Sequence, residues 1–166
     1  YTEGDQKAPD IAMLPDGRFL VVWQSALQDG NSEGVFARFF FPGLEPEAGD
    51  FQVNTETYGT QKDPRAAAVG EDGFVVVWVS SGQDGFMDGI FGQVFDLDGF
   101  PDGDEFQVNT YTMASQLAPA VAGFPGGFVV VWESPGPDGS DTGIMGQRFA
   151  PDGEKWGTEF QVNTYF

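Results

Sequence analysis

The chain has 166 residues, of which 7 are Lys or Arg and 26 are Asp or Glu, so its formal net charge is −19. This charge repels phosphate backbones and anionic headgroups and favours cations as ligands, so we expect no binding to nucleic acid, and no apolar run is long enough for insertion into a membrane. The absence of His and Cys excludes a thiolate or imidazole zinc site and a catalytic Ser–His or Cys–His pair.

Three repeats organise the chain. The string Phe-Gln-Val-Asn-Thr begins at Phe51, Phe106 and Phe160, so it recurs every 54 or 55 residues. Other markers recur in the same phase: Gln6, Gln61 and Gln116; Pro9, Pro64 and Pro119; Trp23, Trp78 and Trp132. The pattern predicts repeat units over residues 1–55, 56–110 and 111–166.

Each repeat is predicted to form four short strands and no helix. The first strands follow the Gln-x-x-Pro marker, at residues 10–14, 65–69 and 120–122. The second strands, at residues 19–23, 74–78 and 128–132, are apolar on both faces, which is typical of strands covered on both sides. The third strands are expected at residues 35–40, 90–95 and 144–149. The fourth are the Phe-Gln-Val-Asn-Thr strings, which alternate apolar and polar residues.

A repeat of this length with four antiparallel strands has the size of a β-propeller blade. The expected fold class is therefore all-β, with three tandem four-stranded antiparallel blades in a propeller-like array. Trp23, Trp78 and Trp132 end equivalent apolar strands, which favours a place in the core over a sugar-stacking role. Closed propellers usually have four to eight blades, so three blades leave two faces without a partner in the chain.

The motifs resemble a family of tandem repeats from large secreted bacterial proteins. The resemblance rests on Gln-x-x-Pro, Gly-Phe-Val-Val-Val-Trp-x-Ser, Gln-Asp-Gly, Gly-Ile-x-Gly-Gln-x-Phe and Phe-Gln-Val-Asn-Thr, which the second repeat carries nearly complete between Gln61 and Thr110. Proteins of this kind are often calcium-associated and either surface-bound or exported. The resemblance therefore implies a propeller-type fold and an extracellular or cell-surface location.

The loop after each second strand is acidic in all three repeats. These loops carry Asp29 and Glu33, Asp84 and Asp88, and Asp138 and Asp141. Calcium takes six to eight oxygen ligands, which short Asp/Gly-rich loops supply from carboxylates and backbone carbonyls. The six residues are therefore candidate Ca²⁺ ligands. Asp-Gly is also a favoured turn dipeptide, so plain turns without metal remain the alternative.

A second acidic cluster occurs in one repeat only. Asp96, Asp98 and Asp102 lie in an Asp-x-Asp-Gly segment between the third and fourth strands of the second repeat. They are further candidate Ca²⁺ ligands. A solvated connecting loop explains the same residues.

The carboxylates recur three-fold, whereas a glycosidase needs two inequivalent carboxylates in one cleft. We therefore expect a non-enzymatic extracellular structural or adhesive protein. Tyr1 and Thr2 match Tyr111 and Thr112, which follow a fourth strand, so copies are expected to associate head to tail as a fibre or a closed ring, stabilised by calcium. The alternative is a lectin-like module whose partners are surface glycans.

Overall fold

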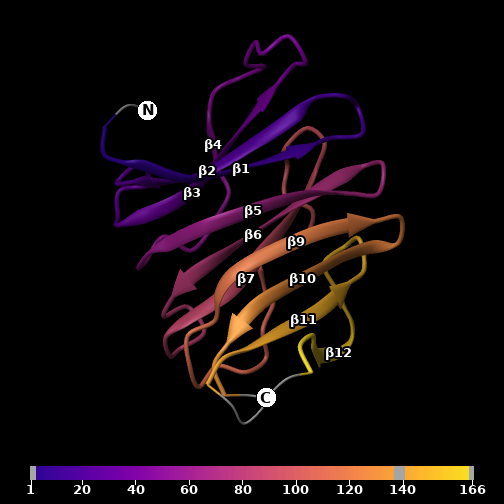
Figure 1. The fold of residues 1–166 in the computed structure, drawn as a ribbon. Helices are drawn as coiled ribbons and strands as arrows, with labels where there is room; N and C mark the ends of the chain where they lie inside the picture. The colour runs from indigo at the N-terminus through magenta and orange to yellow at the C-terminus, as the bar shows by residue number, and fades with distance from the viewer. Residues whose placement is uncertain (1–2, 137–140, 165–166) are drawn as a thin grey trace.

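The computed structural model describes residues 3–136 and 141–164, which form three four-stranded antiparallel sheets (Figure 1). Sheet 1 contains β1 (Gln6–Met13), β2 (Phe19–Ala26), β3 (Glu33–Phe40) and β4 (Phe51–Gln52). Sheet 2 contains β5 (Gln61–Val69), β6 (Gly73–Ser81), β7 (Asp88–Asp96) and β8 (Phe106–Gln107). Sheet 3 contains β9 (Leu117–Phe124), β10 (Gly127–Ser134), β11 (Gly143–Phe149) and β12 (Lys155–Gln161).

The strands of each sheet are paired in chain order, and every pair is antiparallel. The described residues contain no helix, so none of them spans a membrane as a long apolar helix. The prediction of an all-β chain with three four-stranded antiparallel sheets is confirmed. The division into units at residues 55/56 and 110/111 stays a prediction.

One cross-strand pair of phenylalanines recurs in every sheet. Each pair joins the start of the second strand to the end of the third, where the two residues are register partners. The ring centroids are 5.5 Å apart for Phe19 and Phe40, 5.1 Å for Phe74 and Phe95, and 4.9 Å for Phe128 and Phe149. Stacked aromatic pairs of this kind stabilise a sheet beyond the area they bury, and they fix its register.

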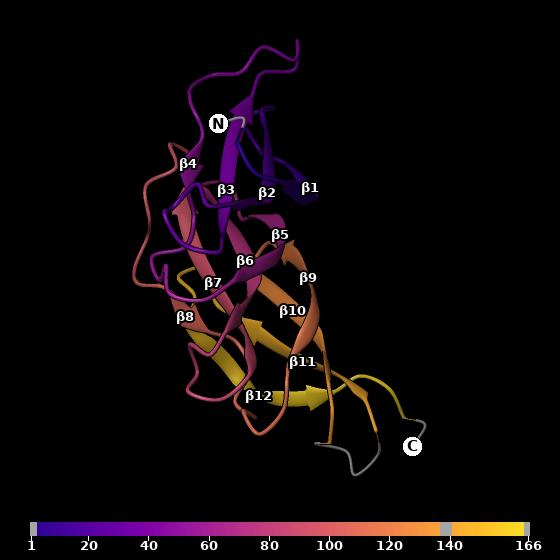
Figure 2. The ribbon, with the colours of Figure 1, turned by 90° about the vertical axis from the view of Figure 1, so that its left-hand side faces the viewer.

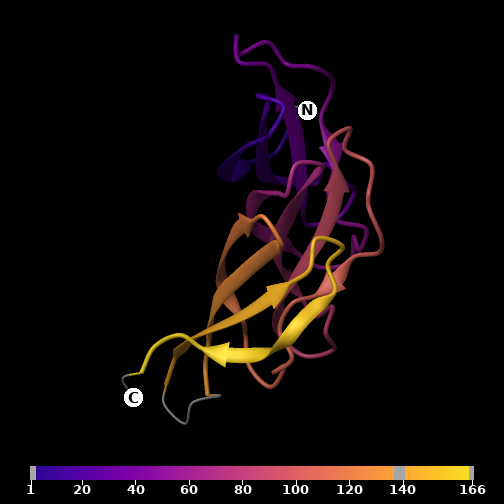
Figure 3. The same ribbon diagram turned by 90° about the vertical axis from the view of Figure 1, so that its right-hand side faces the viewer.

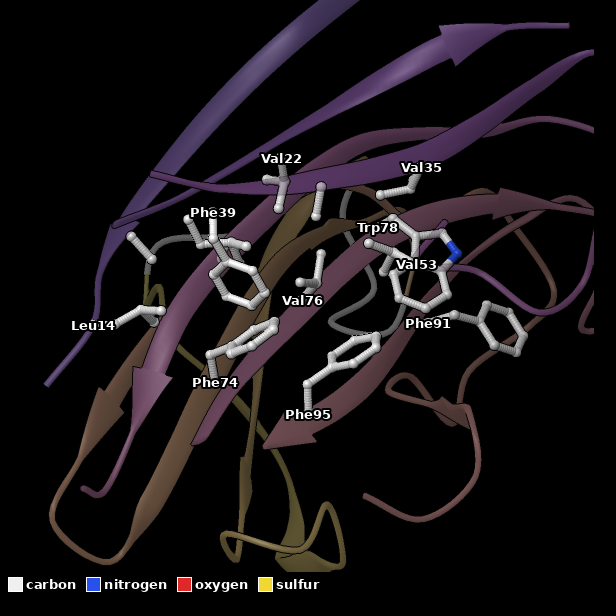
Figure 4. Close-up of a cluster of buried hydrophobic side chains, with 14 residues drawn as sticks. Leu14, Val22, Val35, Phe39, Val53, Phe74, Val76, Trp78, Phe91 and Phe95 are labelled. Carbon is white, nitrogen blue, oxygen red and sulfur yellow. The ribbon is translucent and has the colours of Figure 1, made fainter. Parts of the chain in front are cut away.

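The sheets follow one another along the molecule, and their faces enclose two hydrophobic cores (Figures 2 and 3). Trp78 is fully buried in the core between sheets 1 and 2, beside Val53 and Phe91 (Figure 4). Trp132 is buried in the core between sheets 2 and 3. Trp23 is only half-buried, because no described sheet covers its face of sheet 1.

The first strands begin earlier than the sequence indicated, since β1, β5 and β9 include the Gln-x-x-Pro segment or its end. Each strand is bulged there, and its register with the second strand shifts. The bulge contains a non-glycine residue in the left-handed region, with φ of 48° at Ala8, 52° at Asp63 and 50° at Ala118. Bulges re-aim side chains, so the proline marker lies inside the strand rather than before it.

The predicted fourth strands at residues 51–55 and 106–110 are wrong in length, because β4 and β8 contain only two residues each. The Asn side chain of the motif ends the pairing: Asn54 Oδ1 accepts the N–H of Val35 at 2.7 Å, and Asn109 Oδ1 accepts that of Ile90 at 2.8 Å. A side-chain oxygen thus replaces the backbone acceptor of a continuing strand. In sheet 3, β12 instead begins at Lys155, before the Phe-Gln-Val-Asn-Thr string, and includes Trp156.

A repeated contact joins the fourth-strand edges of successive sheets. The backbone N–H and the Oγ1 of Thr55 both donate to Glu105 Oε2, at 2.8 and 2.9 Å. The N–H of Thr110 donates to Glu159 Oε1 at 2.7 Å, and its Oγ1 bonds the other oxygen of the same carboxylate. We call these contacts the Thr–Glu clamps. The polar residues of Phe-Gln-Val-Asn-Thr therefore hold strands and sheets together.

Candidate functional site

The acidic loops after β2 and β6 are turns that their own aspartates stabilise. Asp29 Oδ1 accepts the N–H of Asn31 at 3.0 Å, and Asp84 Oδ1 accepts that of Phe86 at 3.0 Å. The second oxygen of each carboxylate is buried and has no hydrogen-bond partner among the described residues. A buried charged oxygen without a donor is unfavourable, so a bound cation or water would stabilise it. Calcium binding at these loops stays a prediction.

Glu33 and Asp88 occupy equivalent positions at the starts of β3 and β7, where each pairs with a lysine of the first strand. Lys7 Nζ lies 3.4 Å from Glu33 Oε1, and Lys62 Nζ lies 3.2 Å from Asp88 Oδ2. Ser81 Oγ also donates to Asp88 at 2.5 Å. These carboxylates link the third strand of each sheet to its first strand across the second, so the structure gives them a role that needs no metal.

The remaining candidate ligands are spread over the surface. Asp138 lies outside the described residues, and Asp141 is exposed. Asp96 Oδ1 accepts the N–H groups of Asp98 and Phe100 at 3.0 and 2.8 Å, which makes it a turn residue. Over residues 3–136 and 141–164, no three acidic side chains gather in a way that could hold a metal ion.

A cleft of about 1030 Å³ lies between sheets 2 and 3, where β5, β7 and β9 end. Five carboxylates line it: Glu71, Asp72, Asp96, Asp102 and Asp152. None of the described residues that line the cleft is basic. The cleft is therefore a strongly acidic cavity. Of the candidate Ca²⁺ ligands that line it, Asp102 is the one whose carboxylate has no hydrogen-bond partner among the described residues.

The cleft carboxylates differ in how they are held. Asp96 Oδ1 accepts two backbone N–H groups within its own turn, and Asp152 Oδ1 accepts one within its turn. The carboxylates of Glu71, Asp72 and Asp102 have no hydrogen bond or ion pair with any described residue, and all three residues are exposed. These three are consequently available to an incoming ligand.

Two further carboxylates lie on neighbouring first strands, β1 and β5. Asp10 is half-buried, and its Oδ2 accepts the N–H of Ala66 on β5 at 2.9 Å. Asp63 is also half-buried and lies in the bulge of β5, where Gln24 Oε1 of sheet 1 accepts its backbone N–H at 3.0 Å. The left-handed backbone of Asp63 is shared by the equivalent Ala8 and Ala118, so it belongs to the bulge that recurs in every first strand. Asp10 and Asp63 are thus two inequivalent carboxylates on the neighbouring first strands of sheets 1 and 2.

Sequence reasoning missed these two residues because it looked for carboxylates in Asp/Gly-rich loops, whereas both lie on first strands. Asp63 is equivalent to Ala8 and Ala118, and Asp10 is equivalent to Arg65 and Ala120. Each carboxylate therefore occurs in a single repeat. A search for acidic residues that break the repeat on its first strand would have found both.

No protein-family model matches the chain, and no curated protein sequence matches it. Solved structures do match. An endo-arabinase from Bacteroides thetaiotaomicron has a TM-score of 0.64 and 15% sequence identity, over 99% of this chain and 66% of that one. A GH130-family structure reported with β-1,2-mannosidic linkages in Candida mannan has a TM-score of 0.42 and 11% identity, over 94% and 70%. A glycosyl hydrolase from Bacteroides ovatus has a TM-score of 0.34 and 9% identity, over 94% and 70%.

The match with the endo-arabinase contradicts the prediction of a non-enzymatic structural or adhesive protein. The endo-arabinase shares the fold of nearly the whole chain, and its name is that of a glycan-processing enzyme. The error came from reading three-fold recurrence of carboxylates as the absence of an active site. The chain spans 66% of the length of the endo-arabinase chain, just under two thirds. An extracellular location and association between copies stay predictions.

Proposed function

We propose that the three sheets are successive blades of a β-propeller and that the chain belongs to a carbohydrate-active enzyme. Support for the fold comes from the consecutive packing of sheets 1, 2 and 3, with β1, β5 and β9 as neighbours, and from the match with the endo-arabinase over 99% of the chain. Support for the activity comes from Asp10 and Asp63, and this inequivalent carboxylate pair is the observation on which the proposal rests.

The pair has the chemistry that glycoside cleavage requires. One carboxyl group protonates the leaving oxygen, while the other acts as a base on water or as a nucleophile on the sugar. The hydrogen bond from Ala66 orients Asp10, and the bond to Gln24 fixes the backbone of Asp63 in its strained conformation. Gln24 is 7% exposed, so its position is fixed by the surrounding core. The Asp10 carboxylate is therefore held by β5, and the backbone that carries Asp63 is held by sheet 1.

A cleavage assay tests the proposal directly. The 166-residue chain is incubated with arabinan and with a panel of other polysaccharides, and the release of reducing ends is measured. The proposal expects at least one substrate to be cleaved. Asp10→Asn and Asp63→Asn should each lower the rate by about 10²-fold or more, because each removes one group of an acid–base pair. Asp98→Asn removes an exposed carboxylate away from the pair and should leave the rate unchanged.

The outcomes separate the alternatives. Cleavage that survives both substitutions would refute the assignment of Asp10 and Asp63. A glycan that binds but releases no reducing ends would identify a lectin-like module in place of an enzyme. If no polysaccharide in the panel is bound or cleaved, the carbohydrate function is wrong.

A further inference from the structure

The junction between sheets 1 and 2 contains a guanidinium group where the junction between sheets 2 and 3 contains the acidic cleft. Arg18 lies just before β2, and its side chain is 13% exposed. Its Nε and Nη2 bond Asp16 Oδ2 at 2.7 and 2.6 Å, and its Nη1 bonds Glu47 Oε2 at 2.5 Å. Its Nη2 also donates to the carbonyl oxygen of Leu97 in sheet 2, at 2.7 Å. The guanidinium thus joins the two sheets.

The repeat places the same acidic groups around the cleft. Advancing 55 residues from Asp16 and Glu47 gives Glu71 and Asp102, and both of them line the cleft. The next sheet supplies Pro151, which corresponds to Leu97 one repeat later and also lines the cleft. The carboxylate positions that bind a guanidinium in one junction are therefore present in the other.

The cleft lacks the arginine itself. Advancing 55 residues from Arg18 gives Gly73, which has no side chain to fill the space. A Cβ atom at Gly73 would lie 2.5 Å from the carbonyl oxygen of Phe95, so this backbone leaves no room for a side chain of its own. Five acidic residues consequently line a cavity of about 1030 Å³, and none of the described residues that line it carries a positive charge.

Because Arg18 occupies the equivalent place between sheets 1 and 2, we infer that the cleft binds a guanidinium group from outside the chain, as the side chain of an arginine in a partner protein or peptide. Two carboxylates and a carbonyl oxygen match the planar, forked donors of a guanidinium better than the single point of an ammonium group. The inference is independent of the carbohydrate proposal, because it uses Glu71 and Asp102 rather than Asp10 and Asp63.

Binding is tested by NMR titration with N-acetyl-arginine methylamide as the probe, at low ionic strength. We expect saturable binding in the millimolar range, with the largest amide shifts at Gly73 and Asp102. The citrulline analogue has the same shape without the charge and should bind at least tenfold more weakly. The lysine analogue has the charge without the fork and should also bind more weakly than the arginine probe.

Three variants locate the site. Glu71→Gln and Asp102→Asn should each weaken arginine binding at least fivefold, whereas Asp98→Asn, which removes a carboxylate outside the cleft, should change it less than twofold. All three positions are exposed, so the fold should be retained, and the amide spectrum of each variant checks this. Equal binding of the arginine and citrulline probes would overturn the inference. So would equal weakening by all three variants, because it would mean a diffuse attraction to the net charge.

Discussion

Arg18→Ala removes the guanidinium that joins sheets 1 and 2 and should destabilise the protein. The side chain bonds two carboxylates of sheet 1 and one carbonyl of sheet 2, and it also lies over the ring of Phe39, 4.8 Å from its centroid. After the substitution, the carbonyl oxygen of Leu97 loses its donor and the aromatic face loses its cover. The junction should then resemble the open cleft between sheets 2 and 3.

The expected loss of stability in Arg18→Ala follows from how exposed the partners of Arg18 are. Asp16 and Glu47 are each 33% exposed, so water can replace the guanidinium, and each ion pair contributes only about 0–1 kcal/mol. The bond from the charged Arg18 to the carbonyl oxygen of Leu97 is better shielded and contributes roughly 1.5 kcal/mol. The contact with the Phe39 ring adds about 0.5 kcal/mol. We therefore expect a loss of about 2–4 kcal/mol, which lowers the melting temperature by about 4–16 °C in a chain of this length.

Urea unfolding of the parent and of Arg18→Ala measures this loss. Arg148→Ala is the matched control: Arg148 lies over Trp156 within sheet 3 and joins no two sheets, so its loss should cost less than about 1 kcal/mol. Arg18→Lys keeps the charge but not the fork and should fall between the parent and Arg18→Ala. If Arg18→Ala unfolds at the same urea midpoint as the parent, the guanidinium does not join the sheets. The comparison that supports arginine binding in the cleft would then fail as well.

Two other predictions concern pH and calcium. The hydrogen bond from Arg18 lowers the pKa of Asp16 below its usual 3.8, so its stabilisation is present above that value and is lost as the pH falls through the lowered pKa. The difference in unfolding free energy between the parent and Arg18→Ala should therefore shrink below about pH 4 in acid titrations followed by circular dichroism. Millimolar calcium should raise the melting temperature, and EDTA should reverse the gain, because a ligand of the folded state stabilises it. Asp29→Asn and Asp84→Asn should each reduce the calcium-dependent rise in melting temperature. If calcium does not change the melting temperature, these loops are turns that bind no calcium.

The repeat period predicted the sheets well because equivalent apolar residues form the second strand in each repeat, although Phe19 and Trp23 are only half-buried where no described sheet covers them. Phe74 and Trp78 are fully buried between neighbouring sheets, and their equivalents line the second strands of the other two. The ends of the fourth strands could not be predicted, since the Asn54 side chain imitates a backbone acceptor and so stops the pairing without a change in hydrophobic pattern. The hydrophobic pattern of the sequence is the same whether the strand continues or the Asn side chain replaces its backbone acceptor.

The candidate sites were harder to predict because they depend on differences between repeats. The shared Asp-Gly loops drew attention, yet their aspartates mainly stabilise turns. Asp63 differs from its equivalents in the other repeats, and Gly73 differs from Arg18, and these differences create the carboxylate pair and the open cleft. Alignment of the repeats shows the substitutions, but the contact between Arg18 and Leu97 is needed to show that they matter.

The Thr–Glu clamps have a mechanical consequence. Thr55 ties the fourth-strand edge of sheet 1 to Glu105, while the bond from Ala66 to Asp10 ties the opposite edge of the same two sheets. A joint that is fastened at both edges cannot open like a hinge, so sheets 1 and 2 should move as one stiff body. Thermal fluctuations should then begin in a sheet that has one neighbour and travel inward, since each sheet in such a stack is stabilised by the sheets beside it. The amides of β6, in the middle of the stack, should be the last to exchange with solvent.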